Sequence, residues 1–519
     1  MTDKNRILMI AAENDFLPGA KVGGVGDVIR DLPPALVMQG EVVDVVLPSY
    51  GFLVRLAGME LSGEVQVFFS GVEYSVEVYR YQHTNGGATN YVLHHSAFAP
   101  NGESVYCNDD DNRPFATDAT KYALFCAAVA QSLIASVLPR PNVLHCHDWH
   151  TAFLLILIRY SSTYSSLSSI KTVFTIHNLA LQGVRPFKGD DSSLESWYPN
   201  MHYDGSVISD TVNPHCLNPM RAAILLADRL HTVSPSYAKE VLQASDYDNG
   251  IYGGEGLERD LLYRHEKGDL FGIINGCEYP KGARYASPAK KKLCGVASEC
   301  LVVWASKVAV LASAHFVADK RLQQWLAKKS RGFTLCSIGR VTEQKVKILA
   351  TRLSDGKTAL EHLLILLGDK NQFLMLGSGD NDYEDYLVSV SGQYSNFIFL
   401  NGYSHDLSLD LYRYGDLFLM PSSFEPCGIS QMLAMRAAQP CLVNSVGGLK
   451  DTVIHDKTGF CFSGNTAREQ AEAMLAQVKR LLVLHEEDPS KWKAIVHAAA
   501  DSRFTWEQSA KDYVNLLYK

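Results

Sequence analysis

Two basic residues in the second half of the chain stand where a phosphate-bearing ligand could be held. In SIGRVTEQK, Arg340 directly follows an apolar run and Lys345 comes five residues later. A guanidinium is a fork of donors and an ammonium is a compact charge, so two such cations near one loop suit a diphosphate. The alternative is a salt-bridged surface pair, which is common for any two basic residues. Gly377, in LGSGD, gives conformational freedom to the loop that follows another apolar run.

A carboxylate and a helix start come together in PSSFEPCGISQMLAMRAAQP, residues 421–440. Glu425 follows an apolar run, and a carboxylate in that place can bond sugar hydroxyls. CGIS predicts the start of a long helix, whose free N–H groups at Gly428, Ile429 and Ser430 make a seat for a diphosphate. A plain surface turn is the weaker interpretation, because E-P-C-G is an unusual sequence for one.

A lysine and closely spaced glycines follow the first apolar run of the chain, in KVGGVGDV. Glycine lets backbone N–H groups approach a ligand, and the helix that follows adds partial positive charge. Lys21 adds a full charge beside Gly23 and Gly24. The spacing fits neither the dinucleotide-binding fingerprint nor the phosphate loop with its lysine and hydroxyl. A tight strand-to-helix turn is therefore an equal alternative.

Three histidines and an aspartate lie within HCHDWH, residues 145–150. A metal site is not favoured, because His145 and Cys146 on one strand point to opposite faces and no further ligand is placed nearby. We expect instead a polar rim in which Asp148 accepts hydrogen bonds from hydroxyls. A structural cluster stays open for His145 and His150.

A second polar strand end occurs in TIHNLALQG, where His177 and Asn178 close an apolar run. Both side chains can donate and accept hydrogen bonds. A lone histidine is usually structural, but a His-Asn pair at the carboxyl end of a strand is less often so. We therefore expect this pair beside a ligand.

All these residues follow apolar runs of strand length that alternate with helical patterns. The runs of the first half contain RILMI, VVDVV, NVLHC, TVFTI and RLHTV, and those of the second half FTLCS, FLMLG, FIFLN, LFLM and PCLVN. Nearly continuous apolar strands separated by helices indicate parallel sheets covered on both faces. Two such series predict two doubly wound α/β domains. Because ligands bind beyond the carboxyl ends of parallel strands, we expect the site in a cleft between the domains.

The seam between the domains falls near LFGIINGCEYP, residues 270–280. The lysine- and alanine-rich residues 281–329 predict helices that lead into the second sheet. The tail FTWEQSAKDYVNLLYK has apolar residues at helical spacing and predicts a closing helix. We expect an N-terminal domain over residues 1–272, a C-terminal domain over 273–500 and a terminal helix over 501–519.

Composition and charge argue against several classes of protein. The 519 residues carry a formal net charge of −8 and show no basic stripe typical of nucleic-acid binders. No apolar run approaches the roughly 20 residues of a membrane span, and the N-terminal run is too short for a signal peptide. Eleven cysteines without CxxC spacing indicate reduced thiols in a cytoplasmic chain.

The sequence resembles bacterial glycogen synthases and plant starch synthases, whose motifs it carries in the same order: KVGGVGDV, HCHDWHTA, TIHNLALQG, HTVSPSYAKEV, GIING, SIGRVTEQK and PSSFEPCGISQM. E-P-C-G together with K-x-G-G-x-G-D is a highly specific combination. The resemblance implies a GT-B fold, in which two Rossmann-like doubly wound domains face across a deep cleft and the last helix returns to the first domain. It implies glucose transfer from ADP-glucose to the non-reducing end of an α-1,4-glucan, with retention and without a metal or other cofactor.

The resemblance also implies roles for residues at matching positions. The catalytic group would be Lys21, Asp148, His177, Arg340, Lys345 and Glu425. The group that binds the nucleotide-sugar would be Gly23, Gly24, Asn275, Gly377, Tyr403, Cys427, Gly428, Ile429 and Ser430. In these roles Arg340 and Lys345 would neutralise the leaving diphosphate, and Glu425 would hold the transferred glucose. Tyr403 would stack on the nucleotide base.

The sequence departs from the family's motifs at several places. Glu278 replaces the aspartate of N-G-I-D, Val346 replaces the glycine after Q-K, and Ser423 stands where an arginine is frequent. The stretch FAPNGESVYCNDDDNRP, residues 98–114, lacks the family's proline- and glycine-rich loop on the side expected to bind the acceptor. Three hypotheses stay open: an α-glucan synthase that uses ADP-glucose, a GT-B transferase that uses UDP-glucose or another acceptor, and a catalytically weak glucan-binding homologue.

Overall fold

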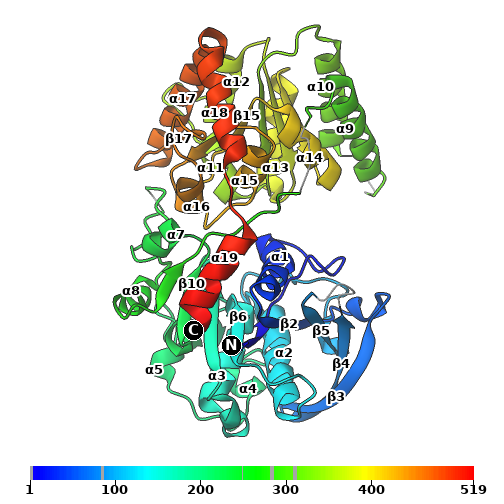
Figure 1. The fold of residues 1–519 in the computed structure, drawn as a ribbon, viewed down its shortest axis with the longest axis vertical. Helices are drawn as coiled ribbons and strands as arrows, with labels where there is room; N and C mark the ends of the chain where they lie inside the picture. Colours follow the sequence, from blue (N-terminus) through cyan, green and yellow to red (C-terminus); the bar gives the residue numbers. More distant parts are fainter. Residues whose placement is uncertain (1–3, 83–86, 248, 281–285, 308–311) are drawn as a thin grey trace. The chain divides into compact units, whose positions relative to one another are not determined.

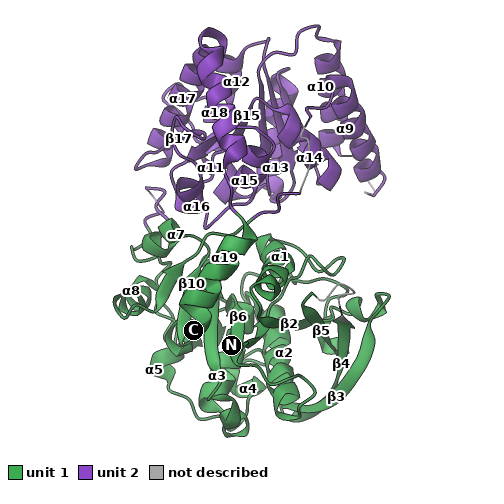
Figure 2. Ribbon diagram, viewed as in Figure 1, with its two compact units in different colours: residues 1–245, 253–276, 505–519 green, residues 246–252, 277–504 purple. Residues whose placement is uncertain are grey.

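The chain folds into two α/β units, coloured separately in Figure 2. The computed structural model describes residues 4–82, 87–247, 249–280, 286–307 and 312–519. Unit 1 comprises residues 1–245, 253–276 and 505–519, and unit 2 comprises residues 246–252 and 277–504.

The observed crossings between the units differ from the expected boundaries. The chain leaves unit 1 after Gly276, four residues beyond the predicted boundary at 272, and returns at Thr505 rather than at 501. Residues 246–252 also belong to unit 2. No apolar periodicity marks so short a segment, so the sequence does not predict its place. The predicted helices after the seam are present in the described part of residues 281–329, and residues 281–285 and 308–311 lie outside the described residues.

Unit 2 is built on a six-stranded parallel sheet, in the order β14-β13-β12-β15-β16-β17. The strands are β12 (Thr334–Ile338), β13 (Gln372–Gly377), β14 (Phe397–Asn401), β15 (Leu417–Met420), β16 (Cys441–Asn444) and β17 (Phe460–Phe462). Counted from one, this is the order 3-2-1-4-5-6 of the Rossmann fold. The predicted doubly wound, Rossmann-like arrangement is confirmed in this unit.

The strands of unit 2 are apolar on both faces because helices cover both. Leu335 and Leu417 pack into one core, and their neighbours Cys336 and Phe418 pack into the other. Successive side chains of a strand point to opposite faces, which produces this alternation. The helices are α9 (Lys290–Ala305), α10 (Ser313–Ala327), α11 (Glu343–Ala350), α12 (Ala359–Leu367), α13 (Asn381–Gln393), α14 (His405–Tyr414), α15 (Ser430–Arg436), α16 (Gly447–Thr452), α17 (Ala467–Glu487) and α18 (Pro489–Asp501).

Unit 1 is built on a nine-stranded sheet, in the order β11-β10-β7-β6-β1-β2-β5-β4-β3. The strands are β1 (Arg6–Ile10), β2 (Val42–Pro48), β3 (Glu60–Phe69), β4 (Val72–Gln82), β5 (Thr89–His94), β6 (Val143–His147), β7 (Lys171–Ile176), β10 (Arg229–Thr232) and β11 (Leu270–Gly272); β8 (Arg185–Pro186) and β9 (Cys216–Leu217) form a separate pair.

The expectation of a wholly parallel sheet is wrong at one edge of unit 1. β3 and β4 form an antiparallel hairpin, and β4 is also antiparallel to β5. Ser70 and Gly71 connect the hairpin with φ of 50° and 80°. Two positive φ values in a two-residue loop match the right-handed twist of a hairpin. The other paired strands of this sheet are parallel.

The helices of unit 1 include the C-terminal one, which returns to the start of the chain. They are α1 (Gly24–Met38), α2 (Ala116–Ile134), α3 (Ala152–Tyr160), α4 (Leu194–Trp197), α5 (Gly205–Ile208), α6 (Pro219–Leu226), α7 (Pro235–Glu240), α8 (Glu258–Glu266) and α19 (Trp506–Tyr513). α19 lies beside α1 (Figure 1), and Trp506, Tyr513 and Leu517 join Val28 and Leu32 in one core. Within the described residues, no helix combines the length and apolarity required to cross a bilayer.

Candidate active site

The cations predicted in unit 2 lie beyond β12, at the point where the strand order of the sheet reverses. β12 and β15 are neighbours, and the chain winds away from them toward opposite edges of the sheet. The loop after β12 carries Arg340 and leads to Lys345 in α11, and the loop after β15 carries Glu425. Ligands of open parallel sheets bind beyond the carboxyl ends of such strands. The sheet order therefore brings together residues that the sequence separates by about eighty positions.

Lys345 and Glu425 form an ion pair at this point. Lys345 Nζ contacts Glu425 Oε2 and also lies 3.3 Å from Ser422 Oγ. Ser422 Oγ donates to the same carboxylate oxygen at 3.0 Å. The lysine side chain is 22% exposed and that of the glutamate only 9%. The pair keeps one charge of each sign where the two loops meet, and the ammonium is more open to solvent than the carboxylate.

Hydrogen bonds hold the two loops against each other. Ser423 N donates to the carbonyl oxygen of Gln344 at 2.8 Å, and Gln344 Nε2 donates to that of Phe424 at 2.7 Å. Ser423 Oγ donates to the same Gln344 carbonyl at 3.2 Å. Ser423 stands where the family frequently has an arginine, and here it is buried in the junction between the loops. These contacts fix Lys345 and Glu425 beside each other.

Arg340 is the uncompensated cation of this group. Its side chain is exposed, and the described residues supply neither an ion-pair nor a hydrogen-bond partner for it. The sequence leaves a salt-bridged pair of Arg340 and Lys345 with other surface residues as the alternative. For Arg340 the structure contradicts that alternative, because its exposed guanidinium has no such partner among the described residues, whereas Lys345 does form an ion pair, with Glu425.

Gly377 is the last residue of β13, and Tyr403 follows β14. A Cβ on Gly377 would lie 1.9 Å from the carbonyl oxygen of Gly339, so only glycine allows the ends of β12 and β13 to approach this closely. The structure thus gives Gly377 a packing role, while its contact with a ligand stays a prediction. Tyr403 is 62% exposed, and its backbone oxygen accepts a hydrogen bond from Trp304 Nε1 at 3.2 Å. The stacking of Tyr403 on the nucleotide base stays a prediction.

The helix predicted after Glu425 is present, but it is not long. α15 has seven residues, Ser430–Arg436, and Ala438 with φ of 65° and Pro440 prevent its continuation. No side chain caps its first turn at Ile429. Gly428 has φ of 74°, and a Cβ there would lie 2.6 Å from Gln431 Oε1. Cys427 is buried. The role of this stretch as a seat for the diphosphate stays a prediction.

In unit 1 the corresponding reversal point lies between β1 and β6. Glu13 follows β1, is 2% exposed, and accepts hydrogen bonds from the backbone of Val22 at 2.7 Å and of Gly23 at 2.6 Å. Its other oxygen accepts from Tyr106 Oη at 2.7 Å. The N–H of Gly23 therefore binds the protein's own carboxylate in this structure, not a ligand. Gly24 is open, because a Cβ there would meet nothing within 4 Å.

The Lys21 side chain is paired with one carboxylate from α1 and one from the loop after β1. Its Nζ lies 2.6 Å from Asp27 Oδ1 and 3.2 Å from Asp15 Oδ2. Burial disfavours the charge of Lys21, but these two carboxylates outweigh it and raise its pKa. The side chain is 32% exposed. The lysine is thus charged and partly accessible, as a ligand-binding role needs, although its charge is already compensated.

Asp148 is a strained and buried residue at the end of β6. It has φ of 56° and ψ of 175°, a region that residues other than glycine rarely adopt. Its Oδ1 accepts the backbone N–H of His177 at 2.8 Å. Burial raises the pKa of Asp148 to about 7, although the backbone N–H groups of His177 and Asn178 act in the opposite direction. Strain and a raised pKa at one strand end are features that functional positions often combine, and the role of Asp148 stays a prediction.

His177 is joined to a neighbouring strand through its ring. Its Nε2 lies 3.0 Å from His147 Nδ1, and burial lowers its pKa to about 3. The residue is 8% exposed. The hydrogen bond from the backbone of His177 places Asp148 and His177 side by side, and their position around the glucose stays a prediction. Asn178 bonds its own loop, since its Oδ1 accepts from Ala180 N at 3.0 Å.

Asn275 lies just before the chain leaves unit 1. It is 4% exposed, and its buried Oδ1 has no hydrogen-bond partner among the described residues. An unpartnered buried amide oxygen calls for a donor, which agrees with a ligand-binding prediction without testing it. No group of three or more metal-ligating side chains is assembled anywhere in the described parts of the chain.

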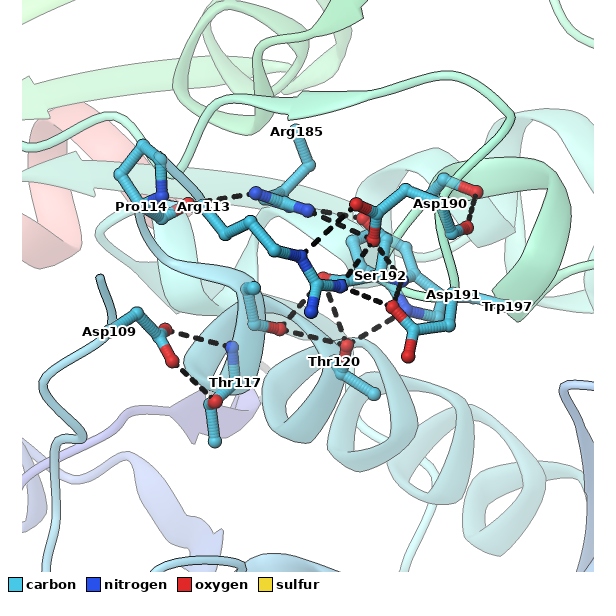
Figure 3. Close-up of polar contacts among 12 residues, drawn as sticks. Asp109, Arg113, Pro114, Thr117, Thr120, Arg185, Asp190, Asp191, Ser192 and Trp197 are labelled. Carbon is cyan, nitrogen blue, oxygen red and sulfur yellow. Dashed lines mark hydrogen bonds and ion pairs between the residues drawn. The ribbon is translucent and has the colours of Figure 1, made fainter. Parts of the chain in front are cut away.

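The divergent loop of unit 1 is firmly anchored (Figure 3). Arg113 donates through Nη2 and Nε to the two oxygens of Asp190, at 2.7 and 3.2 Å. Arg185 lies 3.1 Å from the same carboxylate and donates to the carbonyl oxygen of Pro114 at 3.1 Å. Asp109 accepts from the backbone of Thr117 at 2.8 Å. These contacts tie residues 109–117 to residues 185–190, so the loop that replaces the family's version has a defined place.

Several residues that shape the site are not singled out by the sequence. Glu13 is an acidic residue after the first strand, and nothing in its spacing shows that it binds the glycine loop. Ser422 and Gln344 act through contacts that depend on strand order, and Tyr106 lies in the stretch that departs from the family. For Glu13 alone a signal exists, because it occupies the carboxyl end of a parallel strand.

Two family models match the chain, one in each unit. The first is the starch synthase catalytic domain, over residues 6–262. The second is that of glycosyl transferases group 1, over residues 320–491. The curated relatives include a glycogen synthase of Streptococcus equi subsp. equi, 32% identical over 99% of both chains. Another is a glycogen synthase of Photobacterium profundum, 30% identical over 98% of this chain and 94% of that one.

Solved structures are similar over the same length. The catalytic domain of starch synthase IV from Arabidopsis thaliana, bound to ADP and acarbose, has a TM-score of 0.76 and 26% identity, with 99% of both chains covered. A sucrose-phosphate synthase from Thermosynechococcus elongatus has a TM-score of 0.55 at 16% identity, covering 99% of this chain and 98% of the other. The latter likeness concerns the fold alone.

Proposed function

The chain belongs to the family of glycogen and starch synthases, and we propose that it transfers glucose from ADP-glucose to the non-reducing end of an α-1,4-glucan with retention of configuration. The full-length similarity to glycogen synthases supports an enzyme of the glycosyltransferase class. The starch synthase structure that it resembles holds ADP and acarbose, which supports ADP-glucose as donor and a glucan as acceptor.

One observation carries the proposal: Lys345 contacts Glu425, and Arg340 follows β12, at the reversal point of a Rossmann-ordered sheet. The exposed guanidinium of Arg340 binds the donor diphosphate, and Lys345 adds a second positive charge. These cations stabilise the negative charge that develops on the diphosphate as the glycosyl bond breaks. We propose that they supply this charge without a metal or an organic cofactor.

Glu425 holds the transferred glucose. Its Oε2 is occupied by Lys345 and Ser422, while the described residues supply no partner for Oε1. That oxygen accepts a hydrogen bond from a sugar hydroxyl. The same lysine thus connects the group that binds the sugar with the group that stabilises the leaving diphosphate.

In unit 1, Asp148 and His177 surround the reacting sugar, and Lys21 approaches the substrates from the glycine loop. We propose a front-side reaction, in which the departing diphosphate takes the proton of the acceptor hydroxyl. The bond between the anomeric carbon of glucose and the phosphate oxygen breaks, and the acceptor oxygen bonds to the same carbon on the same face. A glycosidase-type nucleophile is not part of this proposal. The eleven free cysteines support a reducing, cytoplasmic setting.

The test incubates the purified protein with radiolabelled ADP-glucose or UDP-glucose, with and without glycogen. We expect label in glycogen from ADP-glucose, and a loss of about 10²–10³-fold in kcat for Lys345→Ala and Glu425→Gln, as for removal of one preorganised charge. Lys357→Ala, an exposed lysine paired with Asp355, is the matched control. Turnover only with another acceptor, or glucan binding without turnover, would refute the proposal.

A further inference from the structure

Four buried histidines of unit 1 form one connected set that ends at the active-site residue His177. They are His145 and His147 in β6, His177 after β7, and His231 in β10. His145 and His147 stack with ring centroids 4.2 Å apart, and His147 contacts His177. Burial lowers the pKa of each of the four, which keeps the rings neutral at pH 7.

A backbone carbonyl sets the direction of the hydrogen bonds in this set. His231 Nε2 lies 3.3 Å from the carbonyl oxygen of Ile273, which can only accept, so Nε2 carries the proton. The Nδ1 of this neutral ring is then an acceptor. Thr175 Oγ1 approaches it at 3.0 Å and Tyr513 Oη at 3.3 Å, and we assign the donation to Thr175 as the shorter contact. Thr175 must in turn accept from His145 Nε2 at 2.7 Å.

Tyr518, near the C-terminus, is the first donor in this series of hydrogen bonds. His145 carries its proton on Nε2, so its Nδ1 accepts, and Tyr518 Oη donates to it at 2.8 Å. The hydrogen bonds in the series from Tyr518 through His145, Thr175 and His231 to the carbonyl oxygen of Ile273 therefore all donate in the same direction. The ring of His145 is fixed at both nitrogens, and it provides a rigid surface against which the ring of His147 stacks.

His147 has a single hydrogen-bond partner. Its Nδ1 lies 3.0 Å from His177 Nε2, and its buried Nε2 has no partner among the described residues. If His177 donated, the proton of His147 would be on the enclosed Nε2, and a buried N–H without an acceptor is rare and costly. If His147 donates through Nδ1, only a lone pair is left without a partner. The second arrangement is favoured.

We propose that His147 is a positioning residue that holds His177 in the tautomer protonated on Nδ1. His177 Nδ1 has no partner among the described residues and is not enclosed. His177 then presents a neutral N–H donor to an oxygen atom of the bound sugar. The identity of that ligand rests on the proposed function, whereas the tautomer does not.

The first test is nitrogen NMR of the full chain labelled with ¹⁵N in the histidine rings, with the His177 signals assigned by their loss in His177→Asn. We expect His177 to carry its proton on Nδ1 in the wild-type protein without substrate. Protonation of His177 on Nε2 would overturn the proposal, whatever the protein does with ADP-glucose. Absence of glucose transfer with His177 protonated on Nδ1 would refute the proposed function and leave the tautomer standing.

The second test compares two substitutions that place an amide at different ring positions. His147→Asn keeps a donor near the position of Nδ1, and His147→Gln moves the amide toward that of Nε2. We expect mixed His177 tautomers and an at least tenfold lower kcat in His147→Gln, with both properties restored in His147→Asn. His150→Gln, in the same segment, should leave the His177 tautomer unchanged. Equal His177 spectra in the Gln and Asn variants would contradict the role of His147.

Discussion

In the proposed reaction, the contact between Lys345 and Glu425 serves both the transferred sugar and the leaving diphosphate. The glutamate is nearly buried, and the lysine that neutralises it is the more exposed partner. Removing the lysine alone leaves a buried carboxylate without its counter-charge, which is expensive. Variants at this pair therefore need a check of folding beside the activity measurement. Glu425→Gln is the milder change, since it removes the charge and keeps the shape.

Asp148 gives a prediction about pH. Its pKa is about 7 in the folded protein against a model-peptide value of 3.8, so between these values the folded state binds more protons than the unfolded one. The free energy of unfolding contributed by Asp148 is therefore fully present at low pH and falls as pH rises toward 7, by up to about 1.4 kcal/mol per pH unit.

Asp148→Asn removes this dependence. We expect the variant to gain stability relative to the wild type between pH 4.5 and 7, and the difference to be constant between pH 7.5 and 9. Urea unfolding of both proteins, followed through the transition of the unit that holds residue 148, measures it. A difference that stays constant from pH 4.5 to 8 would show that the carboxyl is not perturbed.

At the scale of helices and strands, the close approach of β12 and β13 positions the Arg340 loop. A Cβ at residue 377 would lie 1.9 Å from the carbonyl oxygen of Gly339. Gly377→Ala should therefore force the strand ends apart and destabilise unit 2 by roughly 2–4 kcal/mol, as overpacking and backbone shifts do. Activity should fall with it, because Arg340 follows Gly339 directly.

Gly392→Ala is the matched control for this substitution. Gly392 lies within α13, and a Cβ there would meet nothing within 4 Å. Alanine is better than glycine in a helix, so we expect this variant to be unchanged or up to about 1 kcal/mol more stable. Chemical denaturation measures the free energy of unfolding of both variants and tests this prediction. Equal stabilities would show that the strand ends yield easily.

The sequence predicts where the strands end, but it does not predict which strand ends contact each other. Continuous apolar runs such as Leu417–Met420 identify buried parallel strands, so the residues that follow them are predictable site residues. The contact of Lys345 with Glu425 depends on β12 and β15 being neighbours, which no local pattern encodes. The hairpin of β3 and β4 did have a signal, in Ser70-Gly71 between alternating runs.

At the scale of the molecule, the chain returns to unit 1 after completing unit 2. Tyr518 bonds His145, 373 positions earlier, and both are buried. The predicted cleft between the domains stays a prediction. The return of the last helix, in contrast, is a feature of unit 1 itself, because α19 shares a core with α1.

Tyr518→Phe tests this return. The change leaves His145 Nδ1 buried without a donor, so we expect unit 1 to lose about 1–3 kcal/mol of stability. Tyr394→Phe is a suitable control, because Tyr394 Oη lies 3.5 Å from Glu361 in a half-buried site of unit 2. It should cost less than about 0.5 kcal/mol. Equal losses, measured by denaturant unfolding, would show that Tyr518 contributes no special contact.

The claim on which the account depends is that Arg340 and Lys345 bind the diphosphate of the donor. Calorimetric titration of ADP and of adenosine into the wild type, Arg340→Ala, Lys345→Ala and the Lys357→Ala control measures it directly. We predict that ADP binds at least tenfold more weakly to Arg340→Ala and to Lys345→Ala than to the wild type, whereas the affinity for adenosine changes less than twofold. ADP affinity that is the same in all four proteins would contradict the account.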